Sequence, residues 1–293
     1  MEKIVFLGPK GATFSYQAYE KFSKTHDIPK FDDSELISVK SNTDILRAMT
    51  ETKNLGSFGV LAVETTAQGR VTESVEQFIE LLNEKSVNIL GAIEMRINFA
   101  LMAKSGITKS AIRGILGHEK AFSTCTQNSK LISTNLEEVG SNGKAAEIVA
   151  NNEEYSHYAA IGPTSAAKKF GLEILDSNFE DEEAWTTFFI IGPVRAEIKT
   201  GGENRALIVF KVKDEKGSLV RALNSLKNLN LIHIHSVSLG GREYGFVVEM
   251  EISRKEIPSF QKAMRKFKQC VAQNTIFGPF VIEKDNIKIL SNA

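Results

Sequence analysis

The chain has 293 residues, of which 42% are hydrophobic and 25% are charged, a composition typical of a soluble globular protein of two domains. Its 36 basic residues balance its 36 acidic residues, so charge gives no reason to expect nucleic acid or an anionic membrane as a partner. The two cysteines, Cys125 and Cys270, lie far apart, which argues against a disulfide framework or a structural zinc site. Without a secretory signal pattern or an apolar run of roughly 18 residues, the chain is expected to be cytoplasmic.

Short apolar runs alternate with helical patterns from residue 3 to residue 192, and this alternation predicts an α/β domain with a wound sheet. The predicted strands are Ile4–Leu7, Phe58–Val63, Ile89–Met102, Gly114–Leu116, Tyr158–Ile161 and Phe188–Ile191. The predicted helices are Ser15–Lys24, Thr43–Glu51, Val71–Leu82 and Lys144–Asn151. Ligands of open α/β sheets bind near strand ends and helix starts, so functional residues are expected there.

A second unit follows residues 193–205, where a proline, two adjacent glycines and mixed charges predict a linker. The pattern beyond it predicts a ferredoxin-like βαββαβ order over residues 206–293. Its predicted elements are Ala206–Val212, Gly217–Leu229, Ile232–Leu239, Tyr244–Ile252, Arg254–Lys268 and Gly278–Lys288, with a Gly240-Gly241 turn between the two middle strands.

Candidate functional motifs fall in four segments. They are Met1–Ala18, Gly59–Phe78, Ile115–Cys125 and Asp176–Gly192. In this order, and with residues 141–175 between the last two, they resemble the catalytic domain of prephenate dehydratase. The resemblance implies a two-lobed, periplasmic-binding-protein-like catalytic domain over residues 1–192, with substrate bound between the lobes. Lobe one would comprise residues 1–80 and 176–192, and lobe two residues 81–175.

The resemblance also implies roles for three retained residues. Thr186 stands at the position of the family's catalytic threonine, and Glu64 and His118 are kept in their segments. We therefore expect all three to be catalytic, with Thr186 as the hydrogen-bonding or proton-relaying hydroxyl. The structural alternatives are a threonine that merely favours a strand and a histidine that is satisfied by its neighbours.

Several positions depart from the family pattern. Thr187 replaces an arginine, Thr65 and Thr66 replace an Asn-Ser pair, and Lys120 replaces an amide. A hydroxyl cannot supply the charge of the missing guanidinium, so Arg70 and Lys120 are expected to bind the substrate carboxylates. Either cation could instead be a solvated surface residue, and the two threonines could serve strand-end packing.

Further substrate contacts are expected from the turn and strand that flank these positions. The Gly8-Pro9-Lys10-Gly11 turn precedes a helix and would present backbone donors to an anion. The remaining expected substrate-binding residues are Thr13, Ser15, Trp185, Thr187 and Phe188.

Prephenate loses carbon dioxide in the family's reaction, and the enzyme decides whether the ring hydroxyl leaves. Because the departures fall in the segments that form the site, we expect a prephenate decarboxylase that retains the hydroxyl, serving a specialised amino-acid or antibiotic pathway. The alternative is a prephenate dehydratase that forms phenylpyruvate for phenylalanine biosynthesis. A second alternative is a catalytically silent ligand sensor. No cofactor is expected.

The second unit is similar to an ACT regulatory or assembly domain. Gly217, Ser218, Leu219 and Val220 resemble the motif with which such domains bind an amino-acid effector. The Glu-Ser-Arg-Pro motif of the family is replaced by His235-Ser236-Val237-Ser238, which argues against control by phenylalanine. His233 and His235 lack companions that would complete a metal site, so no metal is expected. ACT domains commonly pair, so a homodimer or homotetramer is expected.

Overall fold

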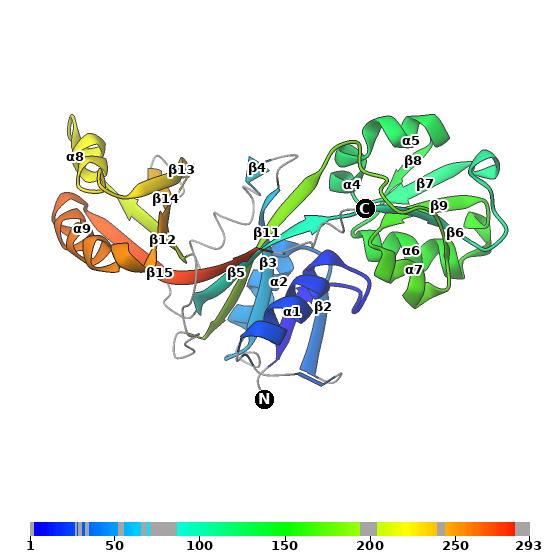
Figure 1. The fold of residues 1–293 in the computed structure, drawn as a ribbon, viewed down its shortest axis with the longest axis horizontal. Helices are drawn as coiled ribbons and strands as arrows, with labels where there is room; N and C mark the ends of the chain where they lie inside the picture. The colour runs from blue at the N-terminus through cyan, green and yellow to red at the C-terminus, as the bar shows by residue number, and fades with distance from the viewer. Residues whose placement is uncertain are drawn as a thin grey trace, which may run out of the picture.

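The computed structural model of the protein describes residues 3–26, 28, 31–32, 35–51, 56–65, 69–70, 87–193, 204–238 and 244–284. The strands within this part form two sheets, a large sheet of ten strands and a small sheet of five. The large sheet extends from the first lobe into the C-terminal unit, and the small sheet with its helices forms a second lobe at the other end of the molecule (Figure 1). We call residues 204–284 the C-terminal unit.

The first lobe begins with a parallel β–α–β arrangement. Its elements are β1 (Ile4–Leu7), α1 (Phe14–Thr25), β2 (Leu36–Val39), α2 (Asn42–Thr50), β3 (Phe58–Thr65), β4 (Gly69–Arg70), β5 (Val87–Ile97) and β11 (Ala184–Pro193). Strand β1 lies between β2 and β3 and is parallel to both, whereas β11 runs antiparallel between β3 and β5. Helix α1 packs on one face of this sheet through Phe22, and α2 packs on the other through Ile45.

The second lobe is a smaller α/β layer. Its elements are β6 (Ala100–Ala103), η3 (Lys109–Ala111), β7 (Gly114–Gly117), α4 (Glu119–Thr124), α5 (Thr126–Ile132), β8 (Leu136–Glu138), α6 (Asn142–Asn151), η4 (Glu153–Tyr155), β9 (Tyr158–Gly162), α7 (Thr164–Phe170) and β10 (Glu173–Asp176). The sheet order is β10-β6-β9-β7-β8. Small residues such as Ala145 and Ala146 of α6 let the helix pack closely on the strands.

The predicted single strand Ile89–Met102 is wrong, because it is divided into β5 and β6, which belong to different sheets. The chain therefore crosses to the second lobe between Ile97 and Ala100 rather than near residue 80. It returns between Asp176 and Ala184, close to the expected position. An apolar periodicity continues through the crossing, which is why the sequence pattern does not reveal it.

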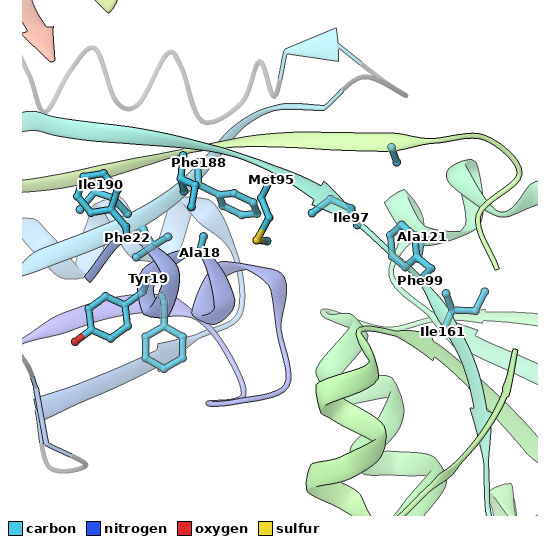
Figure 2. Packing of buried hydrophobic residues seen from close by; sticks show 14 of the residues in the cluster. Ala18, Tyr19, Phe22, Met95, Ile97, Phe99, Ala121, Ile161, Phe188 and Ile190 are labelled. Carbon is cyan, nitrogen blue, oxygen red and sulfur yellow. The ribbon is translucent and has the colours of Figure 1, made fainter. Parts of the chain in front are cut away.

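The crossing is stabilised by one hydrophobic cluster that spans both lobes. Figure 2 shows Phe22, Phe188 and Ile190 packed in the first lobe and Ile97 and Phe99 extending toward the second. Ala121 and Ile161 complete the cluster in the second lobe (Figure 2). Burial of large apolar side chains in both lobes stabilises the two segments that connect the lobes.

The lobes also meet beside the turn after β1. The Ser141 hydroxyl donates to the Gly8 carbonyl at 2.9 Å, and Gln17 Nε2 donates to Ser165 Oγ at 2.9 Å. Gly143 approaches this turn so closely that a Cβ there would lie 2.6 Å from Pro9 Cδ and 2.8 Å from the Ala12 carbonyl. Only glycine fits at this contact without moving one lobe from the other.

The C-terminal unit has the predicted βαββαβ order. Its elements are β12 (Asn204–Lys211), α8 (Ser218–Asn224), β13 (Asn230–Ser238), β14 (Tyr244–Ile252), η5 (Arg254–Glu256), α9 (Ile257–Cys270) and β15 (Gln273–Lys284). Strand β15 pairs in parallel with β5, with Val281 opposite Gly91, and this pairing joins the unit to the first-lobe sheet. Phe210 and Phe267 pack between its own strands and helices.

The fold class predicted from sequence is confirmed, with a two-lobed α/β region followed by a ferredoxin-like unit. The predicted helix Val71–Leu82, most of the predicted linker, the Gly240-Gly241 turn and residues 285–288 of the last strand lie outside the described residues. Among the residues that the structure describes, no helix is both long and apolar enough to cross a membrane.

Candidate active site

A cavity of about 270 Å³ lies between the first and second lobes. The starts of four helices line it: residues 13–15 of α1, 41–43 of α2, 118–120 of α4, and 141–142 of α6. The N-cap residues Thr13, Ser41, His118 and Ser141 each accept a hydrogen bond from an amide of their own helix. Because the amino ends of helices carry partial positive charge, their convergence favours an anionic ligand.

Thr186 lies in this cavity. It is only 8% exposed, and within the described residues its hydroxyl has no hydrogen-bond partner. Phe188 and Ala184 of the same strand also line the cavity, as alternation along a strand requires. Two apolar residues of its own strand therefore flank Thr186, and low polarity beside it would strengthen its hydrogen bond to a ligand.

Thr65 faces Thr186 across two paired strands, and a β-bulge in β3 places it there. Thr186 pairs with Thr65, Thr187 with Glu64, and Phe188 with Ala62, so Val63 is the extra residue. The bulge lets Ala62 and Thr65 both line the cavity, although three positions separate them. Thr65 and Thr186 are therefore neighbours at the cavity wall.

Glu64, Trp185 and Thr187, which we expected at the site, are not among the residues that line the cavity. Thr187 and Trp185 alternate with cavity residues, and the bulge turns Glu64 to the other side of the sheet. Glu64 Oε1 instead lies 3.1 Å from Nε2 of His233 in the C-terminal unit. The expected contact of these three side chains with substrate is therefore not supported by the cavity lining and stays a prediction.

His118 lines the cavity as the N-cap of α4. Its Nδ1 accepts a hydrogen bond from the Lys120 amide at 3.2 Å, so the neutral ring carries its proton on Nε2. Asn142 Oδ1 accepts from the His118 amide at 3.0 Å and ties the segment to α6. Burial, and then the charge of Lys120, hold the pKa of His118 below its usual value despite nearby Glu138. The imidazole is therefore a neutral hydrogen-bond donor at neutral pH.

Two lysines supply positive charge at the cavity. Lys120 was expected there, whereas Lys40 at the end of β2 was not. Within the described part of the chain Lys40 has no ion-pair partner, and its side chain is exposed at the cavity rim. Arg70 pairs through its backbone with Glu64, but its side chain and all of Thr66 lie outside what the structure describes.

Residues beside the glycine turn have a structural as well as a lining role. The Thr13 hydroxyl donates to the Leu7 carbonyl at 2.6 Å, and Ser15 Oγ donates to the Val60 carbonyl at 3.3 Å. Gly11 has a φ of 71°, which glycine adopts without strain. Lys169 Nζ donates to the Lys10 carbonyl, so this turn also contacts the second lobe.

Sequence reasoning missed the polar residues at the starts of α2 and α6. Asn42 Nδ2 donates to the Ala62 carbonyl at 3.4 Å, and Ser41 accepts from the Asp44 amide at 3.1 Å. The Ser41-Asn42-Thr43-Asp44 run is a recognisable helix start, with a hydroxyl N-cap and an acid in the first turn. Ser141 begins α6 in the same way. Each signal marks a helix end, and only the fold shows that the ends converge.

Comparison with known proteins assigns the chain to a family. The family model described as prephenate dehydratase matches residues 4–195. The chain belongs to the prephenate dehydratase family. The prephenate dehydratase of Methanocaldococcus jannaschii is 28% identical over 269 residues, which cover 90% of this chain and 93% of that protein.

Solved structures share the fold across nearly the whole chain. Prephenate dehydratase from Arthrobacter aurescens, solved in complex with L-Phe, has a TM-score of 0.76 at 22% identity and covers 95% of this chain and 89% of its own. A protein described as a novel type of quorum quenching acylase, GqqA, has a TM-score of 0.75 at 22% identity, covering 97% and 98%. Since proteins with different described activities share this fold, fold likeness alone does not define the reaction.

The motif that we expected to bind an effector lies at the start of α8, in the C-terminal unit. Gly217 has a φ of 79° and is the N-cap, Ser218 is buried, and Val220 is 70% exposed. Ser218 Oγ accepts from Arg221 Nη2 at 2.9 Å. None of these residues lines the cavity between the lobes, so any effector they bind would act from a separate place.

Proposed function

We propose that this protein is a lyase that acts on prephenate, and that it is a dehydratase, forming phenylpyruvate, carbon dioxide and water. The observation that carries the proposal is the buried Thr186 hydroxyl in a cavity surrounded by four helix starts. Prephenate is a dianion with a ring hydroxyl opposite one carboxylate, so it needs positive potential and a donor aimed at the hydroxyl. The named activity of relatives such as the Methanocaldococcus enzyme supports the same reaction.

The structure weakens our reason for preferring decarboxylation alone. That preference depended on Thr187 together with Thr65, Thr66 and Lys120, and Thr187 stands where the family has arginine. Thr187 faces away from the cavity, so a threonine there does not remove a cation from the cavity wall. The matched family and the relatives named as dehydratases also favour loss of the hydroxyl. The dehydratase alternative therefore replaces the decarboxylase as the main proposal.

In the proposed reaction, decarboxylation supplies the electron pair that expels the ring hydroxyl. One carbon–carbon bond and one carbon–oxygen bond break, the ring becomes aromatic, and the hydroxyl leaves as water after taking up a proton. Thr186 would hydrogen-bond to the departing oxygen, and the neutral His118 would donate from Nε2 to a substrate oxygen. A positioned proton-transfer group of this kind typically contributes about 100- to 10,000-fold to the rate.

The helix starts and the two lysines would hold the carboxylates. Lys40 belongs to the first lobe and Lys120 to the second, so one cation comes from each side of the cavity. Arg70 remains a candidate for the same task. Binding between the lobes would draw both walls onto one dianion and exclude water from the reacting ring.

For the C-terminal unit, we propose an ACT-like regulatory or assembly role, with Gly217–Val220 at an effector site. Its βαββαβ order and the L-Phe complex of the Arthrobacter protein support this assignment. Titration of the purified protein with L-Phe, followed by calorimetry, tests it. Saturable heat that disappears in Gly217→Val supports the role, and an absence of heat contradicts phenylalanine as effector.

The proposed activity is tested by incubating the purified protein with prephenate and following phenylpyruvate. We expect saturable formation of phenylpyruvate above the uncatalysed rate, and a rate about 100-fold or more lower in Thr186→Val. Turnover of prephenate without formation of phenylpyruvate would support the decarboxylase assignment. An absence of turnover would favour the ligand sensor.

A further inference from the structure

The side of the first-lobe sheet that faces away from the cavity, which we call the back face, carries a row of three adjacent polar residues. Thr187 of β11 pairs with Glu64 of β3 on one side and with Glu94 of β5 on the other. Residues directly opposite in antiparallel strands project to the same face. Two carboxylates therefore flank a threonine that is only 6% exposed.

The C-terminal unit meets this row with side chains from three of its strands. His233 Nε2 of β13 lies 3.1 Å from Glu64 Oε1, and Arg205 Nη2 of β12 lies 3.8 Å from Glu94 Oε2. Arg205 Nη1 also donates to Oε1 of Glu249 on β14 at 3.1 Å. Glu249 is 1% exposed, so the pair is deeply buried. These contacts tie the C-terminal unit to the catalytic sheet.

Glu64, His233 and Glu249 also place one ligand atom each within 4.8 Å of one another, as a metal site would require. The Arg205 guanidinium, however, already lies at hydrogen-bond distance from the Glu249 carboxylate. A metal ion bound to that carboxylate would face this fixed positive charge in a buried place. The contacts therefore favour an ion-pair cluster over a metal site.

One peptide bond, between Glu64 and Thr65, connects this cluster to the cavity wall. Glu64 contacts His233 on the back face, whereas the next residue, Thr65, lines the cavity opposite Thr186. The bulge at Val63 separates the two directions. Because a bulge lacks part of the regular ladder, its shape depends on what holds the neighbouring side chains.

We propose that Glu64 is a positioning residue, held by His233 of the C-terminal unit, which fixes the β3 bulge and thereby the place of Thr65 in the cavity. The catalytic consequence depends on the proposed function, because Thr65 must contact the substrate. His233 Nε2 can donate to a carboxylate whether the ring is neutral or charged, so the link does not require acid conditions. Loss of either partner frees the bulge and misplaces a residue at the reacting centre.

The test is a double-mutant cycle with Glu64→Met, His233→Leu and the combined variant. Glu251→Met is the control, because that carboxylate lies on the same strand as Glu249 but binds Asn230 Nδ2 at 2.9 Å within the C-terminal unit. We expect each single change to lower kcat/KM for prephenate by about five- to tenfold, a discounted value for a partly exposed hydrogen bond to a carboxylate. The combined variant should be no worse than either single one, and the control should match the parent.

A second measurement does not depend on turnover. Hydrogen exchange in a peptide covering residues 60–65 should be faster in Glu64→Met and in His233→Leu than in the parent, and unchanged in the control. If the parent fails to consume prephenate, the proposed function is wrong, and this exchange measurement alone decides the positioning role.

Four results would overturn the proposal. A loss in Glu64→Met that far exceeds the loss in His233→Leu would make Glu64 a directly reacting group. Additive losses of kcat/KM in the combined variant, or unchanged hydrogen exchange in residues 60–65, would show that the Glu64–His233 contact does not fix the position of the bulge. Inactivation of the parent by a chelator and recovery with zinc alone would assign the cluster to a metal.

Discussion

Thr186 and Thr187 are neighbours on β11, yet they face opposite sides of the large sheet. Thr186 lines the cavity between the lobes, whereas Thr187 lies between Glu64 and Glu94 on the back face. Both side chains are buried, at 8% and 6% exposure. The same substitution can therefore be made at both positions. Its effect at Thr186 reports on the cavity, and its effect at Thr187 reports on packing within the sheet.

Changing Thr186 to Val should lower kcat for prephenate by about 100-fold or more, because the change removes a positioned hydroxyl while keeping the shape. Thr187→Val should retain activity within a few-fold. Steady-state kinetics and circular dichroism on both variants check the prediction. Equal losses in the two variants would indicate that strand packing, rather than the Thr186 hydroxyl, supports activity.

The two lysines of the cavity should contribute to binding of the dianion. We expect Lys40→Met and Lys120→Met each to lower kcat/KM by about three- to thirtyfold, since a charge-assisted hydrogen bond is partly screened at an open site. The matched control is Lys144→Met, because Lys144 Nζ binds Glu147 on the outside of α6 at 2.8 Å. Parent-like kinetics in both cavity variants would indicate that Arg70 or the helix amides bind the substrate carboxylates instead.

His118 should make stability depend on pH. Burial and Lys120 lower the pKa of His118 in the folded protein, so the unfolded chain binds more protons as the pH falls below about 6.5. This stabilising contribution is complete above that pH and is lost on acidification toward the lowered folded pKa. In His118→Asn, which keeps an N-cap acceptor, the fall in Tm between pH 7 and pH 5 should be smaller than in the parent. An identical fall would contradict the assignment.

Gly143 should be essential to the contact between the lobes. A Cβ at this position would lie 2.6 Å from Pro9 Cδ, so Gly143→Ala should destabilise the protein by about 1–3 kcal/mol even though alanine favours a helix. Gly140→Ala is the control, since a Cβ there meets nothing within 4 Å. Thermal unfolding compares the two. A Tm for Gly143→Ala at or above that of the parent would show that the lobes adjust freely.

Sequence reasoning found the fold class because periodicity and ordered motifs survive in the chain, and it named Thr186, which lines the cavity. It also named Thr187, which lies on the back face, because the motif resemblance outweighed the simple alternation that already separates neighbours on a strand. Glu64 turns away from the cavity for a different reason. Alternation from Ala62 would place Glu64 in the cavity, and only the bulge at Val63 exchanges it for Thr65.

Of the residues missed entirely, Lys40 follows β2, and Asn42 and Asn142 belong to helix starts that are far apart in sequence. Their local patterns predict where helices begin, but the convergence of α2 and α6 on one cavity is a property of the lobe arrangement. The crossing between Ile97 and Ala100 creates that arrangement, and an unbroken apolar run concealed it.

A dehydratase must break both a carbon–carbon and a carbon–oxygen bond of prephenate at this cavity. Following the reaction by proton NMR while trapping carbon dioxide measures both products in one experiment. We predict one phenylpyruvate for each carbon dioxide released throughout the time course. Release of carbon dioxide with a non-aromatic keto acid that keeps its hydroxyl, in place of phenylpyruvate, would contradict the dehydratase reaction.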